Sequence, residues 1–137
     1  MKSEMLSAVL GEAYIGACEE SLRGLIRDVP SITAAVVATS DGFEVASVQA
    51  DGRMSATRLS ALASSLLALG HAALRELSMN GSGSVLIENA MGKILLVDVR
   101  RARLPVVLCV VADAEAMTGK VLWAARQCAA VLNAAPS

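Results

Sequence analysis

The stretch from Pro105 to Ala112 is apolar at every position, and it constrains the fold more than any other segment. Successive side chains of a β-strand point to opposite faces of the sheet, so a strand with one face in water alternates apolar and polar residues. A strand that is apolar on both alternations has both of its faces covered. The run therefore predicts a central strand over 106–111, in a sheet that carries helices on both sides.

Turn and proline signals divide the rest of the chain into helices and short strands. Val29-Pro30 ends the first helix, because the residue before a proline avoids the helical region, and Asp41-Gly42 favours a hairpin turn. Asp113 is expected to cap the last helix, and Gly81 to follow the end of the second. The predicted order is a helix over 4–28, strands over 33–39 and 43–48, a helix over 56–79 with Ser55 as N-cap, strands over 84–88, 93–99 and 106–112, and a helix over 114–133.

This order predicts a single architecture. Short turns within each group of strands make neighbouring strands antiparallel. The expected fold is an α/β three-layer sandwich, with a five-stranded antiparallel sheet and helices on both faces, in the order helix-hairpin-helix-three strands-helix. A chain of 137 residues is expected to form one domain, 1–137.

Composition excludes several classes of protein. Hydrophobic residues make up 55% of the chain and charged residues 18%, which excludes disorder, and a net charge of −1 argues against a nucleic-acid partner. The odd set of Cys18, Cys109 and Cys128 has no CxxC spacing, so a disulfide framework or a four-cysteine zinc site is not expected, and a reducing cytoplasm is the expected location. The uncharged stretch over 59–74 is too short for a membrane span.

The helix over 56–79 lacks charges around most of its circumference. One side is a wide apolar stripe that is expected to pack on the sheet: Leu59, Leu62, Leu66, Leu69, Ala73 and Leu77. The opposite side should be charged if it met water, but it carries small residues. Two interpretations fit this side: an alanine-rich surface that serves helix propensity, and a subunit interface. The second is favoured and predicts a homodimer through Ala61, Ser64, Ala68 and Ala72.

No arrangement of residues indicates catalysis. The sequence has no P-loop, HExxH, GxSxG or GxGxxG motif, and His71 is the only histidine. We therefore expect no enzyme, no metal and no cofactor. The basic cluster of Arg100, Arg101 and Arg103 is either an anchor for an acidic partner or phosphate, or a solvated turn. Trp123 is expected either to cover the first helix or to stand partly exposed as a weak partner contact.

Several of these segments together resemble the Roadblock (dynein light chain) family. The resemblance rests on Val29-Pro30 with the following hairpin through Ser40-Asp41-Gly42, the uncharged helix over 59–77, the strands over 85–88 and 92–97, and the stretch over 119–126. It covers about residues 18–133, which leaves 1–17 as an N-terminal helical extension. The resemblance implies a homodimer whose sheet continues across both subunits through the strand over 85–88, so Val85 and Ile87 join the expected interface.

The resemblance also implies a function. Members of the family are scaffolds and regulators of Ras-like small GTPases, and bacterial members resemble the gliding-motility regulator that binds a polarity GTPase. The expected function is thus a cytoplasmic, homodimeric, non-enzymatic module that binds a small GTPase. Position alone selects Arg58, His71, Arg75 and Glu76 as partner contacts. Two alternatives remain: a small-molecule-sensing domain, and a structural scaffold without GTPase control.

Overall fold

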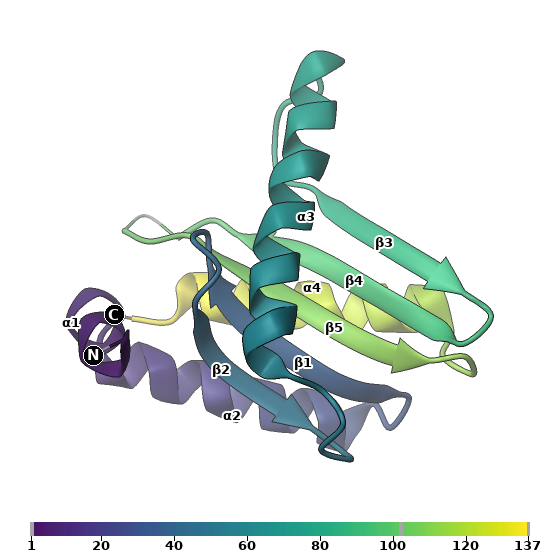
Figure 1. The fold of residues 1–137 in the computed structure, drawn as a ribbon, viewed down its shortest axis with the longest axis horizontal. Helices are drawn as coiled ribbons and strands as arrows, with labels where there is room; N and C mark the ends of the chain where they lie inside the picture. The colour runs from purple at the N-terminus through teal and green to yellow at the C-terminus, as the bar shows by residue number, and fades with distance from the viewer. Residues whose placement is uncertain (1, 102, 137) are drawn as a thin grey trace.

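The computed structural model describes residues 2–101 and 103–136. Met1 and Ser137, at the ends of the predicted domain, and Ala102, in the arginine-rich link, lie outside the described residues. The strands form one antiparallel sheet in the order β2-β1-β5-β4-β3, as Figure 1 shows. Their bounds are β1 (Ile32–Thr39), β2 (Glu44–Gln49), β3 (Ser84–Asn89), β4 (Gly92–Val99) and β5 (Val106–Asp113). The apolar strand β5 lies at the centre, which confirms the position predicted from its sequence.

Helices cover both faces of the sheet. They are α1 (Lys2–Leu10), α2 (Glu12–Asp28), α3 (Ala56–Glu76) and α4 (Thr118–Ala134). α2 and α4 lie side by side on one face, and α3 crosses the other face (Figure 1). The predicted three-layer α/β sandwich with a five-stranded antiparallel sheet is therefore confirmed.

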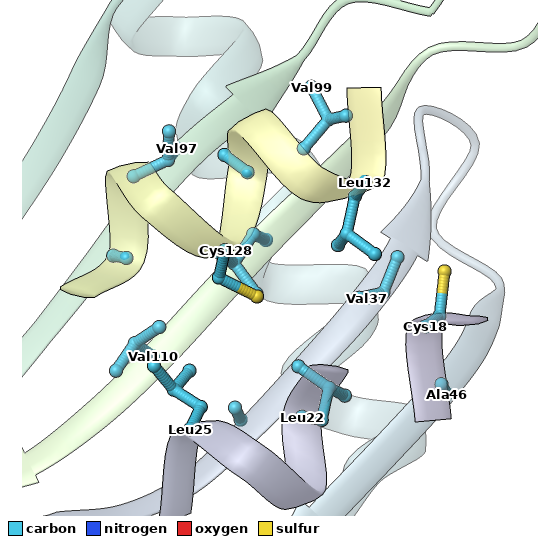
Figure 2. Close-up of a cluster of buried hydrophobic side chains, with 14 of the residues drawn as sticks. Cys18, Leu22, Leu25, Val37, Ala46, Val97, Val99, Val110, Cys128 and Leu132 are labelled. Carbon is cyan, nitrogen blue, oxygen red and sulfur yellow. The ribbon is translucent and has the colours of Figure 1, made fainter. Parts of the chain in front are cut away.

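The sheet separates two apolar clusters. The larger cluster lies between the sheet and the α2–α4 layer, where Leu22, Leu25, Cys128 and Leu132 meet strand residues such as Val110 (Figure 2). The smaller cluster lies beneath α3 and consists of Val36, Ala63, Leu67, Leu96, Val107 and Cys109. Since side chains of β5 enter both clusters, its apolar residues on alternate faces stabilise both layers at once.

The N-terminal segment forms two helices, so the prediction of one helix over 4–28 is wrong. The chain breaks at Gly11, which has a φ of +85° that other residues rarely adopt. Leu6 and Leu10 before the break and Tyr14 after it are all buried. The apolar pattern therefore continues from α1 into α2, and the sequence does not show that the chain changes direction between them.

Two further helix ends differ from the sequence prediction. α3 ends at Glu76 because Ser78 adopts the left-handed conformation, with a φ of +57°, three residues before the expected Gly81. α4 begins at Thr118 instead of 114. Asp113 does not cap it, because its carboxylate accepts a hydrogen bond from the Glu115 N–H at 3.0 Å and so closes a turn before the helix. Across the described part of the chain, none of the helices has the length and apolar character needed to cross a bilayer.

Candidate functional site

Small side chains line the side of α3 that faces the sheet. Ser60, Ala63, Ser64 and Leu67 are buried there. The Ser64 hydroxyl donates to the Thr39 carbonyl oxygen at 2.9 Å, with the Ser60 carbonyl oxygen at 3.0 Å. These contacts satisfy a buried hydroxyl and hold the helix close to the end of β1. The placement of Ser64 in the dimer interface is therefore wrong, since this residue is part of the protein's own core.

The leucine-rich side of α3 is turned outward. Leu62, Leu69 and Leu77 are 57%, 67% and 71% exposed, and we call them, with the exposed Ala73 between them, the leucine face. Their expected packing on the sheet is wrong, whereas Leu59 and Leu66 of the same predicted stripe are half-buried and pack against the cluster beneath α3. The small residues named above occupy that place, because they allow the helix backbone to approach the strands closely. The leucine face then lies on the flank of α3 nearest β3, where Gly70 approaches Val85.

The exposed apolar surface continues onto β3. This strand is at the edge of the sheet, with β4 on one side and no described strand on the other. Leu86 and Ile87 are 44% and 41% exposed, whereas Val85 is half-buried beneath α3. The structure thus places Val85 and Ile87 beside the leucine face. Ala61, Ala68 and Ala72 are exposed as well, but Ala61 lies against Gly42 of the β1–β2 turn, on the opposite flank of the helix.

The four residues selected as partner contacts divide into two groups. Arg58 and Glu76 are exposed near the two ends of α3, about 27 Å apart along a helix that rises 1.5 Å per residue. His71 and Arg75 lie together farther round the helix. His71 Nε2 is 3.0 Å from the Asp98 carboxylate oxygen Oδ2, and Arg100 Nε lies at the same distance from that oxygen.

Asp98 is the residue that sequence reasoning missed. Its side chain is only 8% exposed, although it follows the apolar residues Ile94–Val97 near the end of β4. A lone carboxylate in such a strand was the available signal, because a buried charge needs a partner. His71 and Arg100 supply that partner from a helix and from the link after β4.

The basic cluster over 100–103 does not act as one surface. Arg101 is buried, its guanidinium lies 3.5 Å from the centre of the Tyr14 ring, and it donates to the Leu104 carbonyl oxygen at 3.3 Å. Arg100 turns to Asp98 and to the Gly81 carbonyl, and Arg103 is exposed. Trp123 is 66% exposed on α4, on the far side of the sheet from α3, so of its two expected positions the structure shows the exposed one.

The cysteines are not arranged for nucleophilic chemistry. Burial raises the pKa of Cys18 to about 11, of Cys109 to about 12 and of Cys128 to about 11. A reactive cysteine needs the opposite, a pKa lowered toward neutrality. Within residues 2–101 and 103–136, no group of three or more His, Cys, Asp or Glu side chains is placed to hold a metal ion.

Comparisons with known proteins agree with this architecture. A Roadblock/LC7 domain from Streptomyces avermitilis is 24% identical, with a TM-score of 0.72 over 82% of this chain and 91% of that one. MglB from Myxococcus xanthus is 16% identical, with a TM-score of 0.76 and coverage of 87% and 86%. The gliding protein MglB from Thermus thermophilus is 18% identical, with a TM-score of 0.76 and coverage of 88% and 89%. None of the curated proteins matches the sequence significantly.

The sequence model of the Roadblock/LC7 domain matches residues 19–112, which is more than half of the chain. The solved structures named above share the fold of this chain at low identity. The match and the fold together establish that the chain belongs to the Roadblock/LC7 domain family.

Proposed function

We propose that this protein is a homodimeric, non-enzymatic regulator or scaffold that binds a Ras-like small GTPase. The observation that supports self-association is the exposed apolar surface formed by the leucine face of α3 and by Ile87 of β3 beside it, with Leu86 exposed on the other face of the same edge strand. Apolar patches of this kind on a folded domain mark interaction sites, because water contact with large aliphatic side chains is unfavourable. A second copy of the chain is the simplest partner, since two-fold dimers are the commonest oligomers.

The shape of the molecule supports the same arrangement. β3 has a free edge, whose unpaired backbone groups are suited to pairing with the β3 of a second copy. The last turns of α3 extend beyond the sheet (Figure 1). In a two-fold dimer through β3, each overhanging helix would lie toward the other subunit, and the two leucine faces would cover each other. The proposed interface is accordingly Leu62, Leu69, Leu77, Val85, Leu86 and Ile87, whereas Ala68 lies outside it on the other flank of α3.

The GTPase partner is proposed from the family. Roadblock proteins are expected to regulate or scaffold small GTPases, and paired α3 helices would offer such a partner a shared platform. Arg58 and Glu76 lie on the outermost line of α3 and are the charged groups best placed to contact it. His71 and Arg75 lie on the flank of the platform.

A pair of neighbouring substitutions tests the dimer. Leu69→Glu places a charge on the leucine face, whereas Ala68→Glu places it about 100° round the helix, on the flank away from β3. We expect Leu69→Glu to give a monomer by light scattering while its circular dichroism stays native, and Ala68→Glu to stay dimeric. A Leu69→Glu protein that keeps the mass of the dimer would exclude this interface.

Nucleotide-dependent capture tests the GTPase role. The tagged full chain is incubated with native lysate in two arms, one with excess GTP analogue and one with GDP, and the retained proteins are identified. We expect a small GTPase to be retained in one arm only, and the monomeric Leu69→Glu variant to retain less of it. Retention of the same proteins in both arms, without a GTPase, would favour a structural scaffold.

A further inference from the structure

Two adjoining hollows lie on the flank of α3 that faces away from β3. The larger, of about 490 Å³, lies between α3 and the neighbouring residues Ser40 and Pro105, and the smaller, of about 240 Å³, runs along the end of α3 to Asn80. Three side chains line both hollows, and all three are basic: His71, Arg75 and Arg100. We call this shared region the basic hollow.

The positive charge of the basic hollow is only partly balanced. Asp98 is the single acidic residue among those that line either hollow, and its Oδ2 atom already lies 3.0 Å from both His71 Nε2 and Arg100 Nε. The side chain of Arg75 has no hydrogen bond or ion pair with any residue that the structure describes. His71 Nε2 is buried and lies 3.0 Å from Asp98 Oδ2, but among the same residues it has no partner in hydrogen-bond geometry. The region therefore keeps a net positive charge and unused donors, in a chain whose net charge is −1.

The other end of the larger hollow is apolar. Leu67 and Ala68 of α3 face Pro105 and Val107 at the start of β5 across it. Ligand sites commonly combine an apolar wall with a few convergent polar groups, and hollows of a few hundred cubic ångströms suit small molecules. Arginine is the side chain best matched to phosphate and carboxylate groups, which it binds through parallel N–H donors.

We propose that the basic hollow binds a small organic anion, with its phosphate or carboxylate at Arg75 and Arg100 and its apolar body against Leu67, Ala68 and Pro105. Nothing in this assignment depends on a GTPase. The hollow lies on the opposite flank of α3 from the leucine face, so a ligand there leaves the proposed dimer contact free. Bound ligand would touch α3, the link after β4 and the β1–β2 turn, three segments that surround one side of the helix platform.

Phenyl phosphate is a suitable probe, because it joins a dianion to a small apolar ring. Amide chemical shifts of the full chain are recorded by NMR during titration with phenyl phosphate, and in parallel with inorganic phosphate and with benzyl alcohol. We expect saturable shifts over residues 67–75 and 98–107 with phenyl phosphate, weaker binding of inorganic phosphate, and no binding of uncharged benzyl alcohol. Equal binding of benzyl alcohol, or of inorganic phosphate, would overturn the proposal, because one half of the ligand would then contribute nothing.

A matched pair of variants on α3 locates the site. Arg75→Gln removes a guanidinium that makes no hydrogen bond or ion pair within the described residues, so the fold should be unaffected, and phenyl phosphate should bind about fivefold more weakly, as expected for loss of an exposed ion pair. Arg58→Gln removes an equally exposed arginine outside both hollows and should bind like the unchanged protein. Equal affinity in all three proteins, or shifts confined to other residues, would show that the hollow is not the site. Neither result would bear on the GTPase proposal.

Discussion

Gly70 on α3 and Val85 on β3 approach so closely that a Cβ atom added to Gly70 would lie 2.6 Å from Val85 Cγ2. Within a helix, Gly→Ala normally stabilises by about 1 kcal/mol, because alanine loses less backbone entropy. Here the added methyl group must displace the valine, at a cost of about 1–3 kcal/mol for an overpacked contact. Gly70→Ala is therefore expected to lower the free energy of unfolding, measured with urea at one fixed protein concentration.

Two controls separate the steric contact from helix propensity. Gly16 of α2 is exposed, and a Cβ atom there would meet no heavy atom within 4 Å, so Gly16→Ala should stabilise. In a Val85→Ala background the obstructing methyl groups are absent, and Gly70→Ala should become stabilising as well. A Gly70→Ala protein more stable than the parent would mean that α3 does not lie this close to β3.

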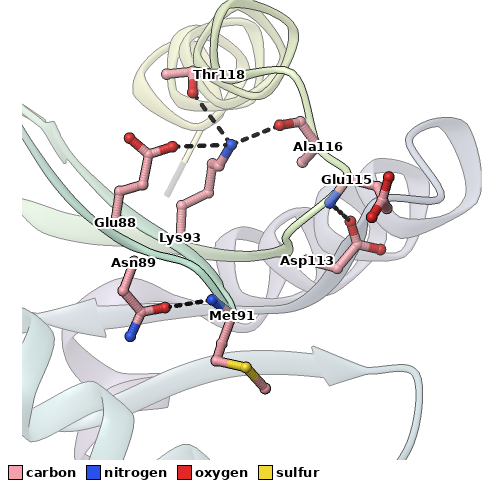
Figure 3. Close-up of polar contacts among 8 residues, drawn as sticks. All are labelled: Glu88, Asn89, Met91, Lys93, Asp113, Glu115, Ala116 and Thr118. Carbon is pink, nitrogen blue, oxygen red and sulfur yellow. Dashed lines mark hydrogen bonds and ion pairs between the residues drawn. The ribbon is translucent and has the colours of Figure 1, made fainter.

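Lys93 connects the β3–β4 hairpin to the start of α4 through a buried ammonium group. Its Nζ atom donates to the Ala116 carbonyl oxygen at 2.6 Å and to Thr118 Oγ1 at 3.3 Å, and lies 3.2 Å from Glu88 Oε2 (Figure 3). Lys93→Met keeps most of the apolar stem but leaves the carbonyl without this donor. We expect a loss of about 2 kcal/mol in the free energy of unfolding, as is typical when a hydrogen bond to a charged group is removed.

Lys120 provides the comparison for Lys93. It is exposed on α4 and has no ion pair within the described ranges, so Lys120→Met should change the free energy of unfolding by less than about 0.5 kcal/mol. If the two lysine variants were equally stable, the buried bond to Ala116 would contribute nothing.

The buried thiols predict a loss of stability in alkali. Burial raises the pKa of Cys109 from its ordinary value of 9.0 to about 12, and that of Cys18 and Cys128 to about 11. Above pH 9 the unfolded chain releases these protons and the folded chain keeps them, so the unfolded state is favoured as the pH rises. The contribution of each thiol to stability is complete below pH 9 and is lost as the pH rises toward the folded value.

Urea unfolding at pH 8 and pH 10.5 measures this effect. At pH 10.5, the Cys109 thiol alone should lower the free energy of unfolding by about 2 kcal/mol relative to pH 8, from about 1.4 kcal/mol per pH unit above 9. The Cys109→Ala variant loses the same packing free energy at both pH values and has no thiol at this position to titrate. Between pH 8 and pH 10.5, its free energy of unfolding should therefore fall by about 2 kcal/mol less than that of the parent. Parallel pH dependence in the two proteins would show that this thiol titrates normally in the folded state.

Much of the fold was predictable because its signals are local. The uninterrupted apolar residues of β5 indicated a central strand, and the turn residue Gly42, with a φ of +92°, indicated the β1–β2 hairpin. Ser55 was correctly identified as the N-cap of α3, where its side chain accepts a hydrogen bond from the Arg58 N–H. The break at Gly11 was missed because helical periodicity is the same on both sides of it.

The candidate site was less predictable, because its groups come from separate elements. His71 and Asp98 meet only when α3 crosses β4, and Arg100 joins them from the link that follows. Arg101, the neighbour of Arg100 in the same basic cluster, turns instead to Tyr14 on the other side of the sheet. The distance along the sequence predicts neither the His71–Asp98 contact nor the Arg101–Tyr14 contact.

The sequence by itself determined that α3 lacks charges around most of its circumference and that most of its small residues and most of its leucines lie on different sides. Only the tertiary structure decided which side meets the sheet. Helical periodicity defines the sides of a helix, but it selects the buried side only when another side is charged. On α3, the close approach allowed by Ser60, Ala63 and Ser64, and the bond from Ser64 to Thr39, oriented the helix and left Leu62, Leu69 and Leu77 exposed.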